Sequence, residues 1–322
     1  MKKFALIGAS GYVAPKHFEA IKNTGNTLVA AFDPFDSVGI IDKYFPTADF
    51  FIEFERFERH LDKLRRKDSS VDYVTVCSPN YLHDSHSRFA LNLGADVICE
   101  KPLALNPRNL EGLRDLEDRT GHKVYSILQL RLHPAIQKLY HKIQSSLAST
   151  IYDVDLTYIA PRGKWYYASW KGDEEKSGGI ATNIGIHFFD MLSWIFGPAQ
   201  KSLVHLYTHD RAAGLLVFNN ANVRWFLSID ASTLPDDVSK AGLSSYRSLS
   251  IQGEEVNFSE GFESLHVKSY EKITDGKGFG INEASPAIEI VHNIRNSTPI
   301  GVKGDYHPFA KKPLSIHPFQ MK

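Results

Sequence analysis

The sequence predicts an α/β domain with a parallel sheet over residues 1–127, followed by an α+β domain with a mostly antiparallel sheet over residues 128–322. In the first part, short and continuously apolar runs alternate with amphipathic stretches, which is typical of buried parallel strands separated by helices. After about Ile127 the runs lengthen and alternate apolar with polar residues, as in 151–158, which indicates antiparallel strands with one covered face. A chain of 322 residues with 43% hydrophobic content suits two domains better than one.

The expected elements follow one another in a regular order. Strands of the first domain are expected at 4–8, 27–32, 73–77, 96–99 and 123–127, with helices over 83–93 and 107–120. Right-handed crossovers make this alternation a doubly wound, Rossmann-type sheet. In the second domain, strands are expected at 151–158, 201–208, 214–218, 223–229, 247–252 and 255–258, and helices from about 134 and over 180–196, 265–275 and 282–295.

Charge and composition exclude several classes of partner. Lys+Arg and Asp+Glu number 37 each, so no basic excess points to nucleic acid or to an anionic membrane. Cys77 and Cys99 end apolar runs and are expected as buried, reduced thiols, and neither cysteine nor histidine spacing indicates a metal site. The first apolar run stops at Gly8, too short for a signal peptide or a membrane span, so we expect a cytoplasmic protein.

A glycine turn follows the first expected strand and opens a helix. Gly8 and Gly11, with the small Ala14 after Tyr12 and Val13, permit a tight turn and a close approach of the backbone to a ligand. The N-terminus of the helix can then bind a pyrophosphate, which predicts a dinucleotide site. The spacing is GxxGxxA rather than the usual GxGxxG, so an ordinary glycine turn is the alternative.

The end of the second strand predicts which dinucleotide is bound. Asp33 lies where a carboxylate can accept hydrogen bonds from the adenosine ribose and repel a 2′-phosphate. Asp36 and Ser37 are near alternatives, although Asp36 also fits a solvated turn. No arginine or lysine follows until Lys43, so the sequence favours NAD over NADP.

Three further motifs carry a family resemblance. Ser78-Pro79-Asn80-Tyr81-Leu82-His83 and Cys99-Glu100-Lys101-Pro102 follow later strands, and Gly185-Ile186-His187-Phe188-Phe189-Asp190 lies in an expected helix. Together they resemble the signature of the glucose–fructose oxidoreductase / inositol dehydrogenase (Gfo/Idh/MocA) family. The resemblance implies a second domain with a large open sheet, a homotetramer, and cofactor contacts from Ser78, Pro79, Asn80, His83, Glu100, Lys101 and Gln129.

Other stretches resemble one branch of that family. Residues 97–102, 128–131, 162–166, 169–173 and 181–187 are similar to those of the bacterial UDP-N-acetylglucosaminuronic acid (UDP-GlcNAcA) 3-dehydrogenases. The resemblance implies oxidation of the C3 hydroxyl of UDP-GlcNAcA to a 3-keto sugar, on the way to lipopolysaccharide O-antigen. In that branch the NAD is regenerated by 2-oxoglutarate.

The oxidation of an alcohol needs a base for the hydroxyl proton, and two residues are candidates. Lys101 follows a parallel strand at its carboxyl end, and partial desolvation beside a cationic neighbour would favour the neutral amine. His187 could orient the hydroxyl or share the proton. The family often has Asp where this chain has Asn183, which cannot act as a base. A surface lysine paired with Glu100 and a structural core histidine are the respective alternatives.

A nucleotide-linked uronate makes further demands on the site. A guanidinium suits its carboxylate, for which Arg131 and Arg162 are candidates. A polar-aromatic loop suits the uracil and diphosphate, although its aromatics could equally pack the sheet. The full set expected to bind substrate is Lys101, Arg131, Arg162, Trp165, Tyr166, Ser169, Trp170, Asn183, His187 and, from another segment or subunit, Tyr246 and Arg247. A dehydrogenase of another sugar or of inositol, and a non-catalytic dinucleotide sensor, stay as alternative functions.

Overall fold

A computed structural model describes residues 1–322 apart from 148, 259 and 320–322. The chain forms two compact units, each built from two separate stretches. The first unit contains Met1–Leu132 and Ser264–Ser285, and the second contains His133–Glu263 and Pro286–Lys322. Within the described residues, no helix combines the length and apolarity that a membrane crossing requires.

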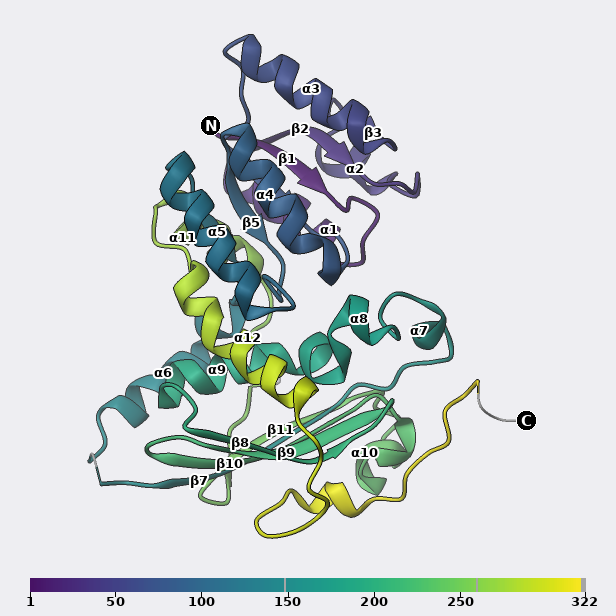
Figure 1. The fold of residues 1–322 in the computed structure, drawn as a ribbon, viewed down its shortest axis with the longest axis vertical. Coiled ribbons are helices and arrows are strands. Elements are labelled where there is room, and N and C mark those ends of the chain that lie inside the picture. Colours follow the sequence, from purple (N-terminus) through teal and green to yellow (C-terminus); the bar gives the residue numbers. More distant parts are fainter. Residues whose placement is uncertain (148, 259, 320–322) are drawn as a thin grey trace. The chain divides into compact units, whose positions relative to one another are not determined.

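The first unit is built on a six-stranded parallel sheet in the order β3-β2-β1-β4-β5-β6 (Figure 1). The five strands expected from the sequence are confirmed within two residues at their ends, and β3 was missed because it has only three residues. The strands are β1 (Lys3–Ile7), β2 (Thr27–Phe32), β3 (Asp49–Phe51), β4 (Tyr73–Val76), β5 (Asp96–Cys99) and β6 (Val124–Ser126).

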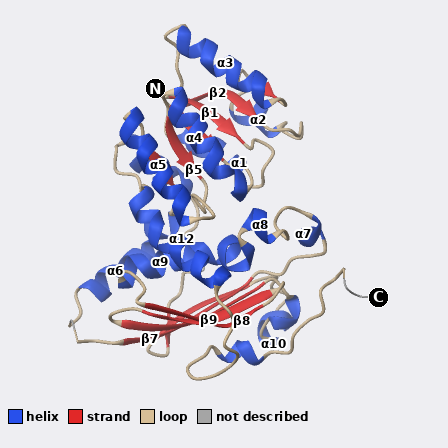
Figure 2. Ribbon diagram, in the orientation of Figure 1, coloured by secondary structure: helices blue, strands red, loops and turns tan. Residues whose placement is uncertain are grey.

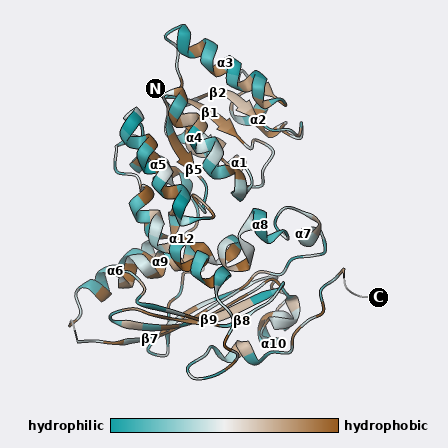
Figure 3. Ribbon diagram, viewed as in Figure 1, coloured by the Kyte–Doolittle hydropathy of each residue, from teal (hydrophilic) through white to brown (hydrophobic). Residues whose placement is uncertain are grey.

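Helices flank this sheet, and Figure 3 shows its strands as hydrophobic while much of α3 and α5 is hydrophilic. The helix α3 was missed by sequence reasoning because, in its thirteen largely charged residues, only Phe57 and Leu61 are buried. The helices are α1 (Ala14–Asn23), α2 (Ile40–Tyr44), α3 (Phe54–Arg66), α4 (His83–Leu93) and α5 (Pro107–Thr120), with short 3-10 turns η1 (Asn80–Leu82) and η2 (Gln129–Leu132).

A helix from much later in the chain completes the first unit. α11 (Leu265–Thr274) packs against α1. Its Tyr270 is fully buried and stacks on Phe4 of β1, with ring centroids 5.7 Å apart. Ile273 joins the same apolar cluster as Phe18 of α1. The core of the first unit therefore depends on residues that follow most of the second unit in sequence.

The second unit is built on a six-stranded mixed sheet in the order β12-β11-β7-β10-β9-β8. The expectation of a mostly antiparallel sheet is confirmed, with one parallel pair, β7 beside β10, at its centre. The strands are β7 (Tyr152–Ile159), β8 (Lys201–Tyr207), β9 (Arg211–Val217), β10 (Ala221–Ser228), β11 (Tyr246–Ile251) and β12 (Glu254–Glu255).

Both faces of the second sheet are covered in part. On β10, Trp225 packs against Phe189 of α9 (Ile186–Phe196), whereas the next residue, Phe226, contacts Phe309 of η5 (Pro308–Lys311). Since neighbouring residues of a strand point to opposite faces, α9 and η5 lie on opposite sides of the sheet. Figure 2 shows α9 beside the sheet with α6. The remaining helices are α6 (Pro134–Gln144), α7 (Trp165–Ala168), α8 (Glu174–Ser177), α10 (Asp236–Lys240), the 3-10 turn η4 (Ala231–Thr233) and α12 (Ile281–Asn296), which crosses the division between the units.

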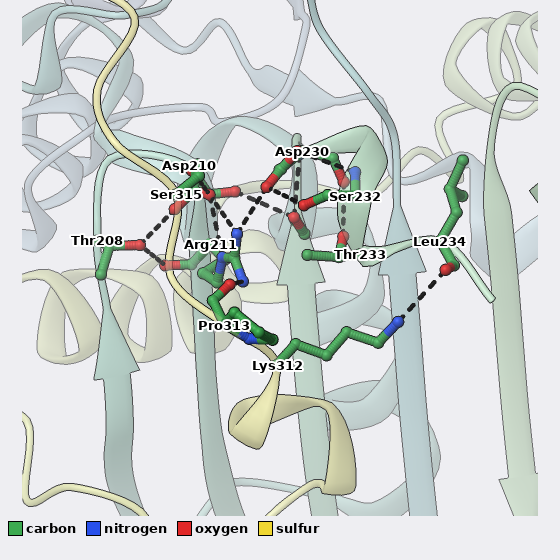
Figure 4. A network of polar contacts seen from close by, with 11 residues as sticks. Thr208, Asp210, Arg211, Asp230, Ser232, Thr233, Leu234, Lys312, Pro313 and Ser315 are labelled. Atoms are coloured by element: carbon green, nitrogen blue, oxygen red, sulfur yellow. Dashed lines mark hydrogen bonds and ion pairs between the residues drawn. The ribbon is translucent and has the colours of Figure 1, made fainter. Parts of the chain in front are cut away.

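A buried arginine ties the C-terminal segment to this sheet (Figure 4). The side chain of Arg211 on β9 has no exposed surface and forms ion pairs with Asp210 and Asp230, both at 2.7 Å. It also donates a hydrogen bond to the carbonyl of Pro313, and the Ser315 hydroxyl donates to Asp210. Burial alone would raise the pKa of Asp210, but these hydrogen bonds outweigh it and lower the pKa. Asp210 therefore stays ionised beside the guanidinium.

Candidate active site

The glycine turn lies at the carboxyl ends of β1 and β4. Gly8 has φ +93°, which L side chains rarely adopt, and a Cβ there would lie 2.6 Å from the carbonyl carbon of Cys77. The Gly8 amide donates to the carbonyl of Phe32 at 2.8 Å, and Gly11 donates back to Gly8. Only glycine fits this position, and the turn runs directly into α1. Tyr12 is fully exposed beside it and Val13 is half-buried.

Asp33 joins the glycine turn to the end of β2. Its carboxylate is buried and accepts hydrogen bonds from the amides of Ser10 and Phe35, each at 2.9 Å. A carboxylate has about four acceptor sites, so two hydrogen bonds leave capacity for ribose hydroxyls. Asp36 and Ser37 are exposed on the following loop. Of these three candidates, Asp33 alone is fixed against the turn.

His83 connects two of the sequence motifs. It is buried, and its Nδ1 and Nε2 lie 2.6 Å and 2.7 Å from the carbonyl oxygens of Pro102 and Ser78. Burial lowers its pKa, although both carbonyls and the charge of Glu100 oppose that shift. The loop after β4 and the loop after β5 are thereby held together. Beside His83, Ser78 and Asn80 are buried and Pro79 is half-buried. The contact of these four residues with a cofactor stays a prediction.

Glu100 and Lys101 follow β5, where parallel sheets usually bind their ligands. Glu100 is buried, and its carboxylate accepts hydrogen bonds from His17, His266 and the backbone amide of Lys101. The Lys101 side chain is half-buried. Glu100 is thus buried and hydrogen-bonded to the two histidines and to the Lys101 amide, and the two residues do not form an exposed surface pair.

Gln129 and Arg131 of η2 differ in what they can still bind. The Gln129 amide oxygen is buried and has no hydrogen-bond partner among the described residues. An amide donor such as the nicotinamide carboxamide of NAD would satisfy it. Arg131 is buried, donates to the carbonyl of Glu283 at 2.8 Å, and lies 5.2 Å from the ring centroid of Phe279. These contacts brace the start of α12, and the predicted carboxylate contact of Arg131 stays a prediction.

In the second unit, Asn183 and His187 are half-buried polar residues of a largely buried helix. The expected helix 180–196 is a π-helical turn η3 (Ala181–Gly185) followed by α9, and such π turns are frequent at functional sites. Asn183 and His187 are half-buried, whereas the residues between and beside them are buried. The Asn183 amide donates to the Tyr166 hydroxyl at 2.9 Å. The structure therefore brings Asn183 to the aromatic loop.

The aromatic loop 162–173 contains a cation that sequence reasoning missed. Lys171 Nζ lies 5.6 Å and 5.0 Å from the ring centroids of Trp165 and Trp170. Burial and the nearby charge of Arg162 lower the pKa of Lys171. Tyr166 is buried, as its aromatic-packing alternative predicts, but Trp165 is 55% exposed and Arg162 is exposed. The sequence signal that could have indicated this cation was Lys171 directly after Trp170. Ser169 closes the turn by donating to the Tyr166 carbonyl.

Arg247 on β11 is held by aromatic rings. Its guanidinium lies 4.4 Å from the ring centroid of Phe262, 5.5 Å from Phe258 and 5.6 Å from Tyr158. Its Nε is buried and lacks a hydrogen-bond partner within the part of the chain that the structure describes. Tyr246 is half-buried beside it. The described residues therefore leave the Nε–H donor of Arg247 unused.

Comparison with known proteins decides the family. Residues 2–127 match the model "Oxidoreductase family, NAD-binding Rossmann fold" and residues 150–277 match "Oxidoreductase family, C-terminal alpha/beta domain". The chain belongs to the Gfo/Idh/MocA oxidoreductases. The resemblance of the three motifs is thereby confirmed, as are the fold class and NAD as the cofactor. The glycine turn and the orphan Gln129 oxygen fit that dinucleotide.

Among Gfo/Idh/MocA structures, the WlbA (WbpB) dehydrogenase of Thermus thermophilus is 48% identical, with a TM-score of 0.93 over 96% of this chain and 100% of that one. It has been solved with NAD and α-ketoglutarate, and with NAD and UDP-GlcNAcA. The WlbA dehydrogenase of Bordetella pertussis shares the fold at 19% identity, with a TM-score of 0.75 over 94% of this chain and 98% of that one.

A curated relative, the D-glucoside 3-dehydrogenase of Escherichia coli K12, is 30% identical over 133 residues, which is 41% of this chain and 38% of that one. The chain thus spans well under two thirds of the length of such curated relatives.

Proposed function

We propose that this chain oxidises the C3 hydroxyl of UDP-GlcNAcA to the 3-keto sugar with NAD⁺. One observation carries the proposal: the 48% identity, over 96% of the chain, with a WlbA dehydrogenase that has been solved with NAD and UDP-GlcNAcA. The substrate complex of that relative supports a nucleotide-linked uronate over inositol or a free sugar. The exposed, cationic and aromatic loop 162–173 agrees with this choice.

In the first unit, we assign Lys101 as the base that removes the hydroxyl proton. It follows β5 at the ligand-binding edge of the sheet, and Glu100 holds its backbone in place. Bound NAD⁺ supplies the hydride acceptor, so a proton goes to Lys101 Nζ and a hydride leaves C3. Asp33 holds the adenosine ribose, and Gly8 allows the pyrophosphate to approach the backbone.

In the second unit, we assign Asn183 and His187 to the sugar hydroxyls, because they are half-buried polar residues among the buried residues of η3 and α9. Asn183 cannot accept a proton at neutral pH, so it orients the sugar. We assign Arg162 and Lys171 to the negative charges of the substrate, and Trp165 and Trp170 to stacking on the uracil. Arg131 is less suited to the carboxylate because it is buried and already bonded.

Regeneration of NAD on the protein is the second half of the proposal. The Thermus relative has been solved with NAD and α-ketoglutarate together. We propose that 2-oxoglutarate takes the hydride back from NADH and becomes 2-hydroxyglutarate, with a proton returned by Lys101. The carboxylates of 2-oxoglutarate and of the uronate would then bind the same cations.

A substrate panel tests this function. With NAD⁺ in excess, UDP-GlcNAcA is expected to produce a 3-oxo sugar nucleotide detectable by mass spectrometry, and 2-oxoglutarate is expected to produce 2-hydroxyglutarate. UDP-GlcNAc, which lacks the carboxylate, and myo-inositol serve as controls. Turnover of myo-inositol or a free sugar without turnover of UDP-GlcNAcA would contradict the proposed substrate.

Replacement of Lys171 by methionine tests the assignment of the aromatic loop. The variant keeps the length and apolar stem of the side chain but loses the charge between the two tryptophans. We expect KM for UDP-GlcNAcA to rise about tenfold while kcat changes little, the pattern of a lost binding interaction. Lys164→Met, at an exposed lysine of the same loop, is the matched control. An equal rise in KM for both variants would indicate only a general charge effect.

A further inference from the structure

A chain of buried polar groups lies behind the Glu100-Lys101 motif. The Thr75 hydroxyl of β4 is 2.8 Å from the Tyr270 hydroxyl of α11, which is 2.8 Å from His17 Nδ1 of α1. His17 Nε2 is 2.9 Å from Glu100 Oε1, and His266 Nε2 of α11 is 3.2 Å from the same oxygen. Three segments of the first unit, β4, α1 and α11, therefore converge on the carboxylate of Glu100.

The direction of each hydrogen bond follows from the chemistry of the groups. An ionised carboxylate only accepts, so His17 and His266 both donate through Nε2, and the Lys101 amide donates to Oε2. His17 Nδ1 then accepts from the Tyr270 hydroxyl, and Tyr270 accepts from Thr75 if His17 is neutral. Burial lowers the pKa of His17, which agrees with the neutral ring. Every group then points its donor toward Glu100.

We propose that His17 and His266 are positioning residues for Lys101, acting through Glu100. They donate to the Glu100 carboxylate, which accepts a hydrogen bond from the backbone amide of Lys101. This hydrogen bond fixes the position of the backbone from which the Lys101 side chain extends. The kinetic part of this inference rests on the proposed function, in which Lys101 is the base. The hydrogen-bond directions do not depend on it.

The ionised state of Glu100 depends on these donors. Burial alone would raise its pKa, but the hydrogen bonds that His17 and His266 donate outweigh burial and hold the pKa of Glu100 well below its ordinary value. A protonated Glu100 would have to donate a hydrogen and would release one of its three donors. The titratable groups that face it are His17, His266, Tyr270, Cys77, Cys99, His83 and Lys101.

The same three side chains could instead ligate a cation, since their ligand atoms lie within 4.8 Å of one another. Two observations favour the hydrogen bonds. The His17 and Glu100 atoms are 2.9 Å apart, whereas two ligands about 2.0–2.1 Å from one tetrahedral metal lie roughly 3.3 Å apart. The other nitrogen of His17 and the other oxygen of Glu100 also have protein partners, Tyr270 and the Lys101 amide.

Kinetics of His17→Leu and His17→Gln test the positioning role. His17→Leu removes the donor, whereas in His17→Gln the side-chain amide can still reach Glu100 Oε1. We expect His17→Leu to lower kcat about tenfold, while KM and the Kd of NAD stay within about threefold of the wild-type values. His17→Gln should recover most of the lost kcat. Protonation of Glu100 should also lower kcat at acid pH. In His17→Leu this acid limb of the kcat–pH profile should move to higher pH, because Glu100 loses a donor and its pKa rises.

Tyr270→Phe separates positioning from structure. It removes a buried hydroxyl of the same chain but no donor to Glu100, so Tm should fall while the acid limb stays in place. The acid limb could move equally in Tyr270→Phe, or it could fail to move in His17→Leu. Either result would show that His17 and the other buried polar groups have only a structural role. A stoichiometric metal in the purified protein that His17→Leu abolishes would also overturn the proposal.

Histidine-selective nitrogen NMR of the full chain tests the hydrogen-bond directions without any substrate. We expect a neutral ring with its proton on Nε2, identified as the signal lost in His17→Gln. A proton on Nδ1, or a charged ring at neutral pH, would overturn the inferred directions. If the NMR result holds but UDP-GlcNAcA is not turned over, the failure lies with the proposed function and not with the network.

Discussion

Replacement of Lys101 by alanine is expected to lower kcat for the oxidation of UDP-GlcNAcA about 10²–10⁴-fold, the usual contribution of a general base. The side chain follows β5 at the edge where parallel sheets bind ligands, and Glu100 fixes its backbone. Single-turnover kinetics measure the chemical step directly. The Kd of NAD should change far less than kcat, since Lys101 is only one of the expected cofactor contacts, and Gly8, Asp33 and Gln129 are untouched.

Two variants control this result. Lys101→Arg keeps a positive charge but stays protonated, so it should be about as inactive as Lys101→Ala if a base is needed. Lys123→Ala removes a half-exposed lysine of the same unit, paired with Glu117, and should leave kcat unchanged. Activity retained in Lys101→Arg would show that the charge matters rather than the proton. A non-catalytic dinucleotide sensor would show no turnover in the wild type and no loss on substitution.

Replacement of Arg211 by methionine is expected to lower the free energy of unfolding by about 3–5 kcal/mol, because it leaves Asp210 buried with its charge uncompensated. The side chain of Asp210 is only 2% exposed, and its pKa is low because Arg211, Ser315 and Thr208 hydrogen bond to it. The variant should therefore be least stable at neutral pH relative to the wild type. Urea unfolding followed by circular dichroism at several pH values measures both effects.

Arg224→Met on the adjacent strand β10 is the matched control. Arg224 also pairs with aspartates, but Asp153 and Asp155 are 56% and 36% exposed, so water can solvate them after the change. A loss of about 1 kcal/mol is expected there. If both variants lose the same stability, burial of the ion pair is not what makes Arg211 important.

The pH dependence of the wild-type interaction has a definite sign. The pKa of Asp210 is lowered by folding, so its contribution to stability is present above its ordinary pKa and is lost as the pH falls through the lowered value. In Arg211→Met this sign should reverse, because burial without the guanidinium raises the pKa of Asp210 and disfavours its charged form at neutral pH. The difference in stability between wild type and variant should then shrink in acid.

The sequence predicted the parts of the fold that local patterns determine. Continuous apolar runs gave the strands β1, β2, β4, β5 and β6, and the alternation in 151–158 gave β7. The parallel pairing of β7 with β10 could not be predicted, because alternation indicates a covered face and not the direction of the neighbouring strand. Likewise, the apolar pattern of 265–275 predicted a helix, but nothing local shows that it packs on α1.

The candidate site divides in the same way. The glycine turn, Asp33 and the Glu100-Lys101 motif could be found because each is a short sequence at the end of a strand. The partners of Glu100 could not, since His17 and His266 are 249 positions apart in the numbering and only folding brings their rings to 5.0 Å. Lys171 could have been noticed beside Trp170, but its second contact, with Trp165, depends on the turn closed by Ser169.

The return of α11 to the first unit has a consequence for how the protein is made. All strands of the parallel sheet have been synthesised once the ribosome has passed Ser126, yet Tyr270 and Ile273, which complete the core around Phe4 and Phe18, come about 150 residues later. At a synthesis rate of about 5–20 residues per second, the nascent sheet waits about 8–30 s with apolar surface uncovered. Chaperone binding to the nascent chain is expected to concentrate in that interval and to end when α11 emerges.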